Sequence, residues 1–222
     1  MPRSPSSPRT KAAAASKTAA VLIPPRPTLR KLREIAAGCT ACPLFAQATQ
    51  TVFGEGPGQA PLMLVGETPG DQEDFAGRPF VGPAGKLLDR CLADAGIDRA
   101  AVYVTNVVKH FKWEPRGKRR LHKKPNSFEI RACKPWLEAE AELVRPQVLV
   151  CLGATAAQAI LGPAFRVSTA RGEWVSSTWA DHVLATFHPS ALLRAQDDDR
   201  EEKIALFIKD LKKAAAVVKA AA

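Results

Sequence analysis

Short apolar runs alternate with amphipathic segments along most of the chain. Four runs have the length and composition of buried strands, namely residues 62–66, 101–108, 148–153 and 182–187. Apolar residues recur with helical spacing over residues 29–38, 86–96, 126–145, 154–161 and 201–219. Strands that alternate with helices are typical of an α/β fold. We therefore predict a three-layer α/β/α sandwich around a central, largely parallel, four-stranded sheet.

Capping signals support several of these boundaries. Thr28 precedes the first helical segment, which Gly38 ends. Asn126 or Ser127 caps the long helix, and Glu129 is placed for reciprocal capping.

The segment before Thr28 has a different composition from the rest. Residues 1–27 are rich in proline, alanine and serine, so we predict a disordered, basic tail, followed by one domain over residues 28–222. The tail lacks the apolar core of a signal peptide, and six prolines oppose the amphipathic helix of a transit peptide. The sequence contains no run of about 18 apolar residues, so we predict no membrane span. We expect a cytoplasmic monomer.

The net charge of +10 is unevenly distributed. The tail contains five Lys or Arg and no acid. Residues 109–124 hold eight Lys or Arg against one Glu. We predict a basic loop over residues 109–126, in which Phe111 and Trp113 are interleaved with the cations. Such a patch suits a polyanion, most commonly nucleic acid, although a solubilising surface is the alternative.

Four of the five cysteines form a candidate metal site. Cys39 and Cys42 have chelating C-x-x-C spacing, and 17 residues separate Cys133 from Cys151. Cys91 occupies an apolar helix position and fits a core role. Without a secretory signal, the cysteines indicate a reducing compartment, where metal binding is commoner than disulfides. The spacing leaves zinc and iron–sulfur both open.

Candidate chemistry follows each predicted strand, where sites form in parallel sheets. After the first strand, GETPGDQEDFAGRPFVGPAG combines a tight glycine- and proline-rich path with Glu67, Asp71, Glu73, Asp74 and Phe80. The segment has no dinucleotide or P-loop pattern, and its acids would repel phosphate. It fits a pocket that stabilises positive charge beside a flat ring.

Three further residues are ambiguous when each is taken alone. Asn106 can read one edge of a base or cap a turn. His188 precedes Ser190, a potential N-cap at a helix start that could bind an oxyanion. His122 lies within GKRRLHKKPN, residues 117–126, and could be a solvated loop residue.

Together these segments resemble a known family. GETPGDQEDFAGRPFVGPAGKLLDR, TNVVKH, CLGATAAQAILG and HPSALLR resemble uracil-DNA glycosylases of the family-four, iron–sulfur type, over residues 30–215. The insertion EPRGKRRLHKKPN resembles the UdgX branch, whose members bind uracil-DNA covalently and irreversibly. Thr68 stands where that branch usually has glutamine, which puts the polar contact at this position in question.

The resemblance implies a role for each candidate. Phe80 would stack on a flipped uracil, Asn106 would read its O4/N3 edge, and His188 would donate to O2 as charge develops on the leaving base. Glu67 and Asp71 would stabilise the cationic sugar, and Thr68 would contact uracil. The implied DNA contacts are Lys118, Arg119, Arg120, Lys123, Lys124 and Ser190. A [4Fe–4S] cluster would be held by Cys39, Cys42, Cys133 and Cys151.

The resemblance also assigns His122 as the nucleophile that captures the sugar C1′. Attack requires a neutral imidazole, and we expect Arg119, Arg120, Lys123 and Lys124 to favour it by lowering the histidine pKa. The expected substrate is uracil-containing DNA, preferably single-stranded. The alternatives are a turning-over glycosylase in which water attacks, and a non-catalytic iron–sulfur protein that binds nucleic acid.

Overall fold

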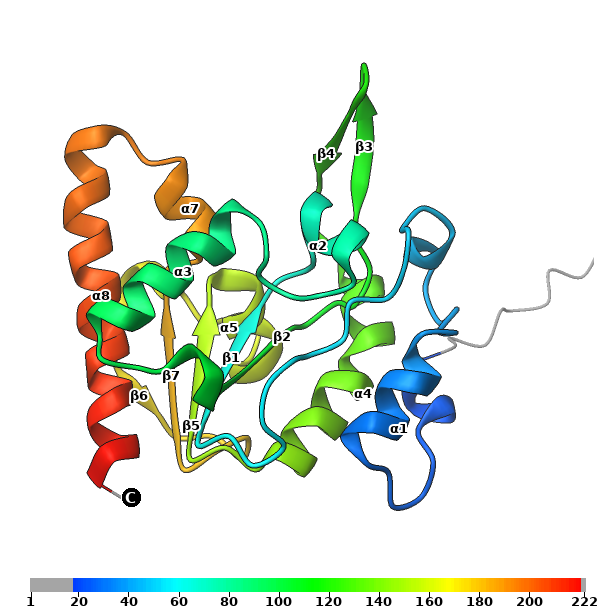
Figure 1. Cartoon of the computed structure of the whole chain (residues 1–222), viewed down its shortest axis with the longest axis horizontal. Coiled ribbons are helices and arrows are strands. Elements are labelled where there is room, and N and C mark those ends of the chain that lie inside the picture. Colours follow the sequence, from blue (N-terminus) through cyan, green and yellow to red (C-terminus); the bar gives the residue numbers. More distant parts are fainter. Residues whose placement is uncertain (1–17, 221–222) are drawn as a thin grey trace, which may run out of the picture.

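The computed structural model describes residues 18–220 and contains a five-stranded central sheet (Figure 1). Its strand order is β2-β1-β5-β7-β6. β1, β2, β5 and β7 are parallel, whereas β6 is antiparallel to β7. The bounds are β1 Leu62–Gly66, β2 Val102–Asn106, β5 Val148–Leu152, β6 Trp174–Val175 and β7 His182–Thr186. The α/β fold class with helices on both faces is therefore confirmed, but the sheet has five strands, not four.

The helices occupy both faces of this sheet. The α-helices are α1 Leu29–Ala36, α2 Asp71–Ala76, α3 Pro83–Asp94, α4 Ser127–Val144, α5 Ala154–Leu161, α6 Val167–Ala170, α7 Pro189–Leu193 and α8 Asp197–Ala220. Three 3₁₀ turns, η1 Ala19–Leu22, η2 Pro43–Ala46 and η3 Arg99–Ala101, complete the helical elements. Asn126 and Glu129 form the predicted capping box at the start of α4.

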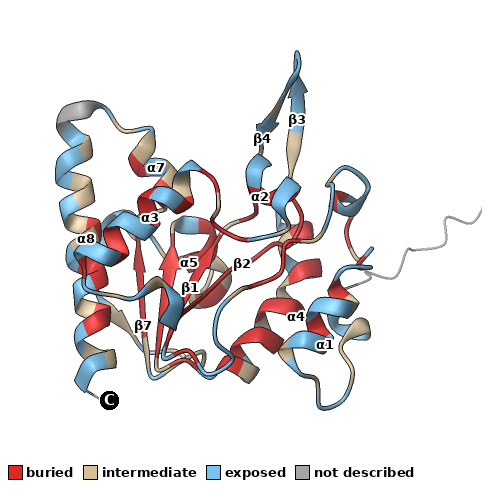
Figure 2. Cartoon of the chain, viewed as in Figure 1, coloured by how far each residue is buried: buried red, intermediate tan, exposed pale blue. Residues whose placement is uncertain are grey.

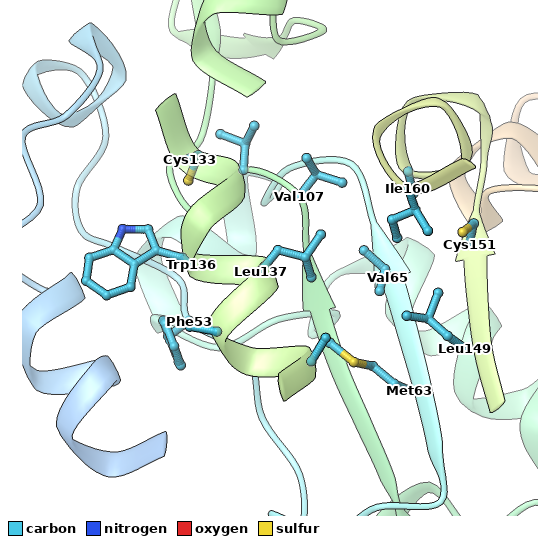
Figure 3. Packing of buried hydrophobic residues seen from close by; sticks show 14 of the residues in the cluster. Phe53, Met63, Val65, Val107, Cys133, Trp136, Leu137, Leu149, Cys151 and Ile160 are labelled. Atoms are coloured by element: carbon cyan, nitrogen blue, oxygen red, sulfur yellow. The ribbon is translucent and has the colours of Figure 1, made fainter. Parts of the chain in front are cut away.

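Strand residues alternate between two hydrophobic cores because successive side chains point to opposite faces. On β1, Met63 and Val65 pack with α1, α4 and α5, as Figure 3 shows for part of this core. Leu62 and Leu64 pack instead with α3, α7 and α8. All five residues of β1, β2 and β5 are buried (Figure 2), which accounts for their near-continuous apolar sequences.

The basic segment is a β-hairpin rather than the loop that we predicted. β3, Trp113–Arg116, pairs antiparallel with β4, Arg119–His122, in a separate two-stranded sheet. Gly117 turns the chain with a φ of +58°, a conformation that glycine adopts without strain. The hairpin projects from the end of the molecule where the parallel strands finish (Figure 1). Its high density of cations concealed its strand character.

The predicted disordered tail requires a partial correction. Residues 1–17 lie outside the described residues. Residues 18–27 are described, and Ala19 within η1 is fully buried in the core that contains α4. Burial of this apolar turn fixes a segment that its proline content had placed in the tail. Among the described helices, none is both long and apolar enough to cross a membrane.

Candidate active site

The aromatic ring and the amide of the predicted pocket meet at the end of β1. Gly66 pairs in register with Asn106, the last residue of β2. A Cβ added at Gly66 would overlap the Asn106 side-chain oxygen and would lie 2.7 Å from Phe80 Cζ. Glycine at this position therefore leaves the space in which the ring of Phe80 and the amide of Asn106 come together.

Phe80 is held in a conformation that few residues adopt. Its φ is +56°, although it carries a bulky side chain. Its carbonyl lies against Gly85 of α3 so closely that a Cβ at that position would overlap it. Backbone strain of this kind persists only when the surroundings enforce it, and it often marks functional positions. The close packing against α3 supplies the enforcement and aims the ring at Asn106.

His188 follows β7 and lies beside Phe80. The two ring centroids are 6.2 Å apart and the planes are tilted by 32°. The Ser190 backbone N–H donates to His188 Nδ1 over 3.1 Å, so the ring proton resides on Nε2. Burial, followed by the nearby His122 and Arg194, lowers the pKa of His188 to about 4. At neutral pH this residue is an uncharged imidazole with one N–H to donate.

Ser190 does not have the role that its sequence position indicated. His188, not Ser190, is the N-cap of α7. The Ser190 N–H is engaged with the His188 ring, and its hydroxyl lies 2.8 Å from the same nitrogen. The residue therefore orients the histidine rather than offering a free N–H group to a phosphate.

Glu67 is a carboxylate that acts electrostatically on His122. It follows β1 directly and accepts a hydrogen bond from Thr155 Oγ1 of α5. Its charge acts on the imidazole of His122, whose pKa it raises against a larger opposing effect. The hydroxyl donor and the strand end hold the carboxylate between the sheet and the hairpin.

His122 ends β4, and its environment favours the neutral imidazole. The residue is exposed to solvent, and its pKa is lowered, first by partial desolvation of the ring and then by Arg194, while Glu67 and Glu73 oppose the shift. Its ring centroid lies 6.0 Å from that of Phe111. The direction of the shift is as we expected, but the cause is different, because the hairpin's own cations do not produce it. Arg194 was absent from the sequence-based site, and Glu73 was named there without a role of its own.

Arg120 fastens the hairpin to α2. Its Nε donates to Asp71 over 2.6 Å and its Nη1 to Asp74 over 2.7 Å. The guanidinium also lies 4.1 Å from the ring centroid of Phe75 and 5.2 Å from that of Phe111. Only 17% of its side chain is exposed.

These contacts change the interpretation of two predicted residues. Arg120 uses these donors within the protein and so anchors the hairpin, and its contact with DNA stays a prediction. Asp71 is the partner of Arg120, and no described interaction joins it to His122.

The other predicted polar contacts fall into two groups. Thr68 is buried and donates to the His110 carbonyl over 2.8 Å, so its hydroxyl is engaged with the backbone. Lys123 pairs with Glu114 across the hairpin at 2.7 Å. Lys118, Arg119 and Lys124 are exposed and make no ion pair among the described residues. These three remain available to a polyanion.

Three of the four predicted cysteine ligands come together, and Cys151 lies apart. The pKa of Cys133 is raised to about 12, mainly by burial and further by the nearby Cys42 and Cys39 thiols. Trp136 on α4 donates to Cys39 Sγ over 3.4 Å. Cys151 lies within β5, between β1 and β7, and Figure 3 shows it well separated from Cys133. The predicted four-cysteine set is therefore not assembled.

His110 is a buried group near the three cysteines that sequence reasoning missed. Its Nε2 lies 2.9 Å from Thr51 Oγ1, which donates to the Ala36 carbonyl. The backbone N–H of Cys39 donates to the same carbonyl. Burial lowers the pKa of His110 to about 4, so its imidazole is neutral at pH 7. Within residues 18–220, no three His, Cys, Asp or Glu side chains are arranged around a single metal ion.

A buried ion pair connects Cys133 to the backbone of Asn106. Lys109 Nζ donates to Glu140 over 2.5 Å and to the Asn106 carbonyl over 2.7 Å. The Lys109 backbone N–H donates to Cys133 Sγ over 3.2 Å. Glu140 accepts further bonds from Tyr103, Thr105 and the Gly54 N–H. Lys109 had been counted only as one of the cations of the basic patch.

Comparisons with known proteins identify the family of this chain. A type-4 uracil-DNA glycosylase of Thermotoga maritima is 39% identical over 82% of this chain and 90% of its own length. A type-4 enzyme of Pyrobaculum aerophilum is 36% identical over 75% and 85%, respectively. The crystal structure of wild-type Pedobacter heparinus SMUG2 aligns with a TM-score of 0.47 and 15% identity, covering 71% of this chain and 77% of that one. The model of the uracil DNA glycosylase superfamily matches residues 53–212, and the chain belongs to this superfamily.

Proposed function

We propose that the protein excises uracil from DNA and then captures the resulting sugar through His122. The observation that carries this proposal is the pocket at the strand ends, where the Phe80 ring lies 6.2 Å from that of His188 and meets the Asn106 amide beside Gly66. Glu67 acts on the pKa of His122, and His122 acts on that of His188. A nucleophile, a carboxylate and a hydrogen-bond donor for the leaving base therefore share the space beside Phe80.

Uracil recognition is assigned to the pocket at the strand ends. A flipped uracil stacks on Phe80, and the Asn106 amide pairs with its O4/N3 edge. Cytosine presents an amine donor in place of O4, so the same amide orientation rejects it. His188 donates its Nε2–H to O2, where negative charge develops as the base leaves. Lys109 donates to the Asn106 backbone carbonyl and so fixes the backbone from which this amide projects.

Bond cleavage and capture follow from the same arrangement. The C1′–N1 bond breaks with its electron pair on uracil, and Glu67 stabilises the cationic sugar. The lone pair of neutral His122 then forms a bond to C1′, and the imidazolium product loses its remaining N–H proton to solvent or to Glu67. Water does not attack C1′ in this sequence, so the alkylated protein does not turn over.

The substrate that we propose is single-stranded, uracil-containing DNA bound by a monomer. A single strand needs no base pair to be broken before flipping. Lys118, Arg119 and Lys124 are exposed on and beside the hairpin and would neutralise flanking phosphates. A hydrolytic, turning-over glycosylase is the second candidate, because both compared relatives carry the name of type-4 enzymes.

We also propose an iron–sulfur cluster held by Cys39, Cys42 and Cys133. Their thiols are buried and influence one another's ionisation. Neutral imidazoles and thiolates are both known cluster ligands, and His110 is the buried group that could complete the set. When bound, the cluster would tie α1 and α4 together and serve a structural role.

Denaturing gel electrophoresis separates the candidate functions. After incubation with uracil-containing single-stranded DNA, a protein–DNA band that survives denaturation supports capture. Abasic DNA with free protein supports the turning-over enzyme, and intact DNA supports a binding protein. The His122→Ala variant should lose the band, whereas His182→Ala, which changes a histidine on β7, should keep it. A band that persists in His122→Ala would exclude His122 as the nucleophile.

Iron content and visible absorbance test the cluster. The protein should bind iron and absorb broadly in the visible range. Cys133→Ser should lose both signals, and Cys151→Ser should retain them because Cys151 lies apart. Colourless protein that carries zinc, or equal loss in both variants, would contradict the assignment.

A further inference from the structure

A second hollow lies on the hairpin, and it is outside the uracil pocket. Its volume is about 500 Å³, and it is lined by Asp71, Phe75, Lys118, Arg119 and Arg120. Phe75 of α2 is 62% exposed, which is unusual for so large an apolar side chain. The uracil recognition and sugar capture proposed above use none of the exposed surface of Phe75.

Phe75 presents a ring that is fixed and still accessible. The Arg120 guanidinium lies 4.1 Å from its centroid. The same guanidinium is bound by Asp71 and Asp74, so the cation that supports the ring cannot move away freely. A cation over one face leaves the opposite face for a flat partner. This arrangement is a preformed stacking platform.

The charge around the platform favours an anion next to that flat partner. The Asp71 carboxylate, the single acid of the lining, is already paired with Arg120. Lys118 and Arg119 are exposed at the hairpin turn and have no ion-pair partner among the described residues. A flat apolar surface beside free cations matches the base and the phosphate of a nucleotide.

We propose that this hollow binds a nucleotide of the same DNA strand, adjacent to the flipped uracil. The proposal rests on the proposed function, because the uracil in its pocket and the sugar at His122 position the strand. Arg120 and His122 occupy alternate positions of β4, about 7 Å apart along the strand. The nucleotide that adjoins the captured sugar is therefore within reach of Phe75. Its base stacks on the free ring face, and its phosphate contacts Lys118 and Arg119.

Stacking on an aromatic platform tolerates any base, so this subsite adds affinity without sequence preference. One face of Phe75 is already covered, so we expect a contribution in the lower part of the usual range. Phe75→Ala should weaken DNA binding about 5- to 20-fold. Arg119→Ala should lower the slope of log affinity against log salt by about 0.7, the value for one phosphate of a single strand.

The test combines protein variants with DNA that lacks single bases. The full chain carrying His122→Ala keeps binding reversible, and fluorescence anisotropy measures its affinity for single-stranded uracil oligonucleotides. In each oligonucleotide, a tetrahydrofuran spacer replaces one base near the uracil. At one adjacent position, the spacer should weaken binding when Phe75 is present and have no further effect in Phe75→Ala. Phe75→Trp should retain the sensitivity.

The test also has a matched control and two outcomes that would overturn the proposal. Phe45 of η2 is 44% exposed and lies outside the hollow, so Phe45→Ala should change affinity less than about 2-fold. The subsite is overturned if Phe75→Ala binds like its parent, or if its effect adds to that of every spacer. Failure of the proposed function would appear separately, as uracil-DNA that the unaltered protein neither cleaves nor captures.

Discussion

Glu140→Gln should be among the most destabilising single changes in this protein. Lys109 and Glu140 are 1% and 0% exposed, and their charges are 2.5 Å apart. Glutamine keeps the shape and can still accept from Tyr103, but it leaves the Lys109 ammonium buried without a counter-charge. Breaking a buried pair in this way costs about 3–5 kcal/mol. For a chain of this size, the melting temperature should fall by about 6–20 °C.

Thermal and urea unfolding, followed by far-UV circular dichroism, measure this loss. Lys203→Met removes a partner from the exposed Lys203–Asp199 pair and should change stability by less than about 0.5 kcal/mol. The double variant Lys109→Met/Glu140→Leu should recover part of the loss, because no charge then stays buried. A loss below about 1 kcal/mol in Glu140→Gln would refute the reasoning, since the lysine would then be deprotonated or hydrated at little cost.

Three further changes probe the site. Gly66→Ala should abolish uracil excision while the protein stays folded, because the alanine Cβ would displace the Asn106 amide. Unchanged excision in the gel assay would mean that the pocket lies elsewhere. Arg120→Ala should make the hairpin sensitive to limited proteolysis and slow adduct formation, because it removes the bonds to Asp71 and Asp74. Arg119→Ala should weaken DNA binding alone. Equal proteolysis of the two variants would show that Arg120 is not the anchor. The rate of adduct formation should fall only as the pH drops below the ordinary range of histidine, because the lowered pKa of His122 keeps its imidazole neutral to more acidic pH; a rate that rises with acidity would show that the neutral ring is not the attacking form.

The sheet and its main helices were predictable because each has a strong local pattern. Apolar runs gave β1, β2, β5 and β7, and the capping box at Asn126 gave the start of α4. β6 was missed because two residues carry no periodicity, and it forms only by pairing with β7. The hairpin was missed because its strand residues are mostly charged and its order depends on Arg120.

The candidate site was predictable where chemistry follows a strand end. Phe80, Asn106 and His188 do come together, because the ends of parallel strands share one edge of the sheet. Spacing could not place Cys151, which lies within β5 and apart from Cys133 (Figure 3). Burial and long-range pairing determine the roles of Lys109 and Glu140, and neither effect has a signature in local sequence.

The hairpin forms its own two-stranded sheet and shares no ladder with the central one. Its attachment depends on side chains, chiefly Arg120 with its two carboxylates and Lys112 with Glu129 at 2.9 Å. A unit attached in this way can open without unfolding the core. If His122 captures the sugar as proposed, opening of the hairpin removes the nucleophile and leaves the uracil pocket intact. We then expect the free energy of hairpin opening, and not the stability of the whole domain, to set the fraction of molecules that can trap DNA.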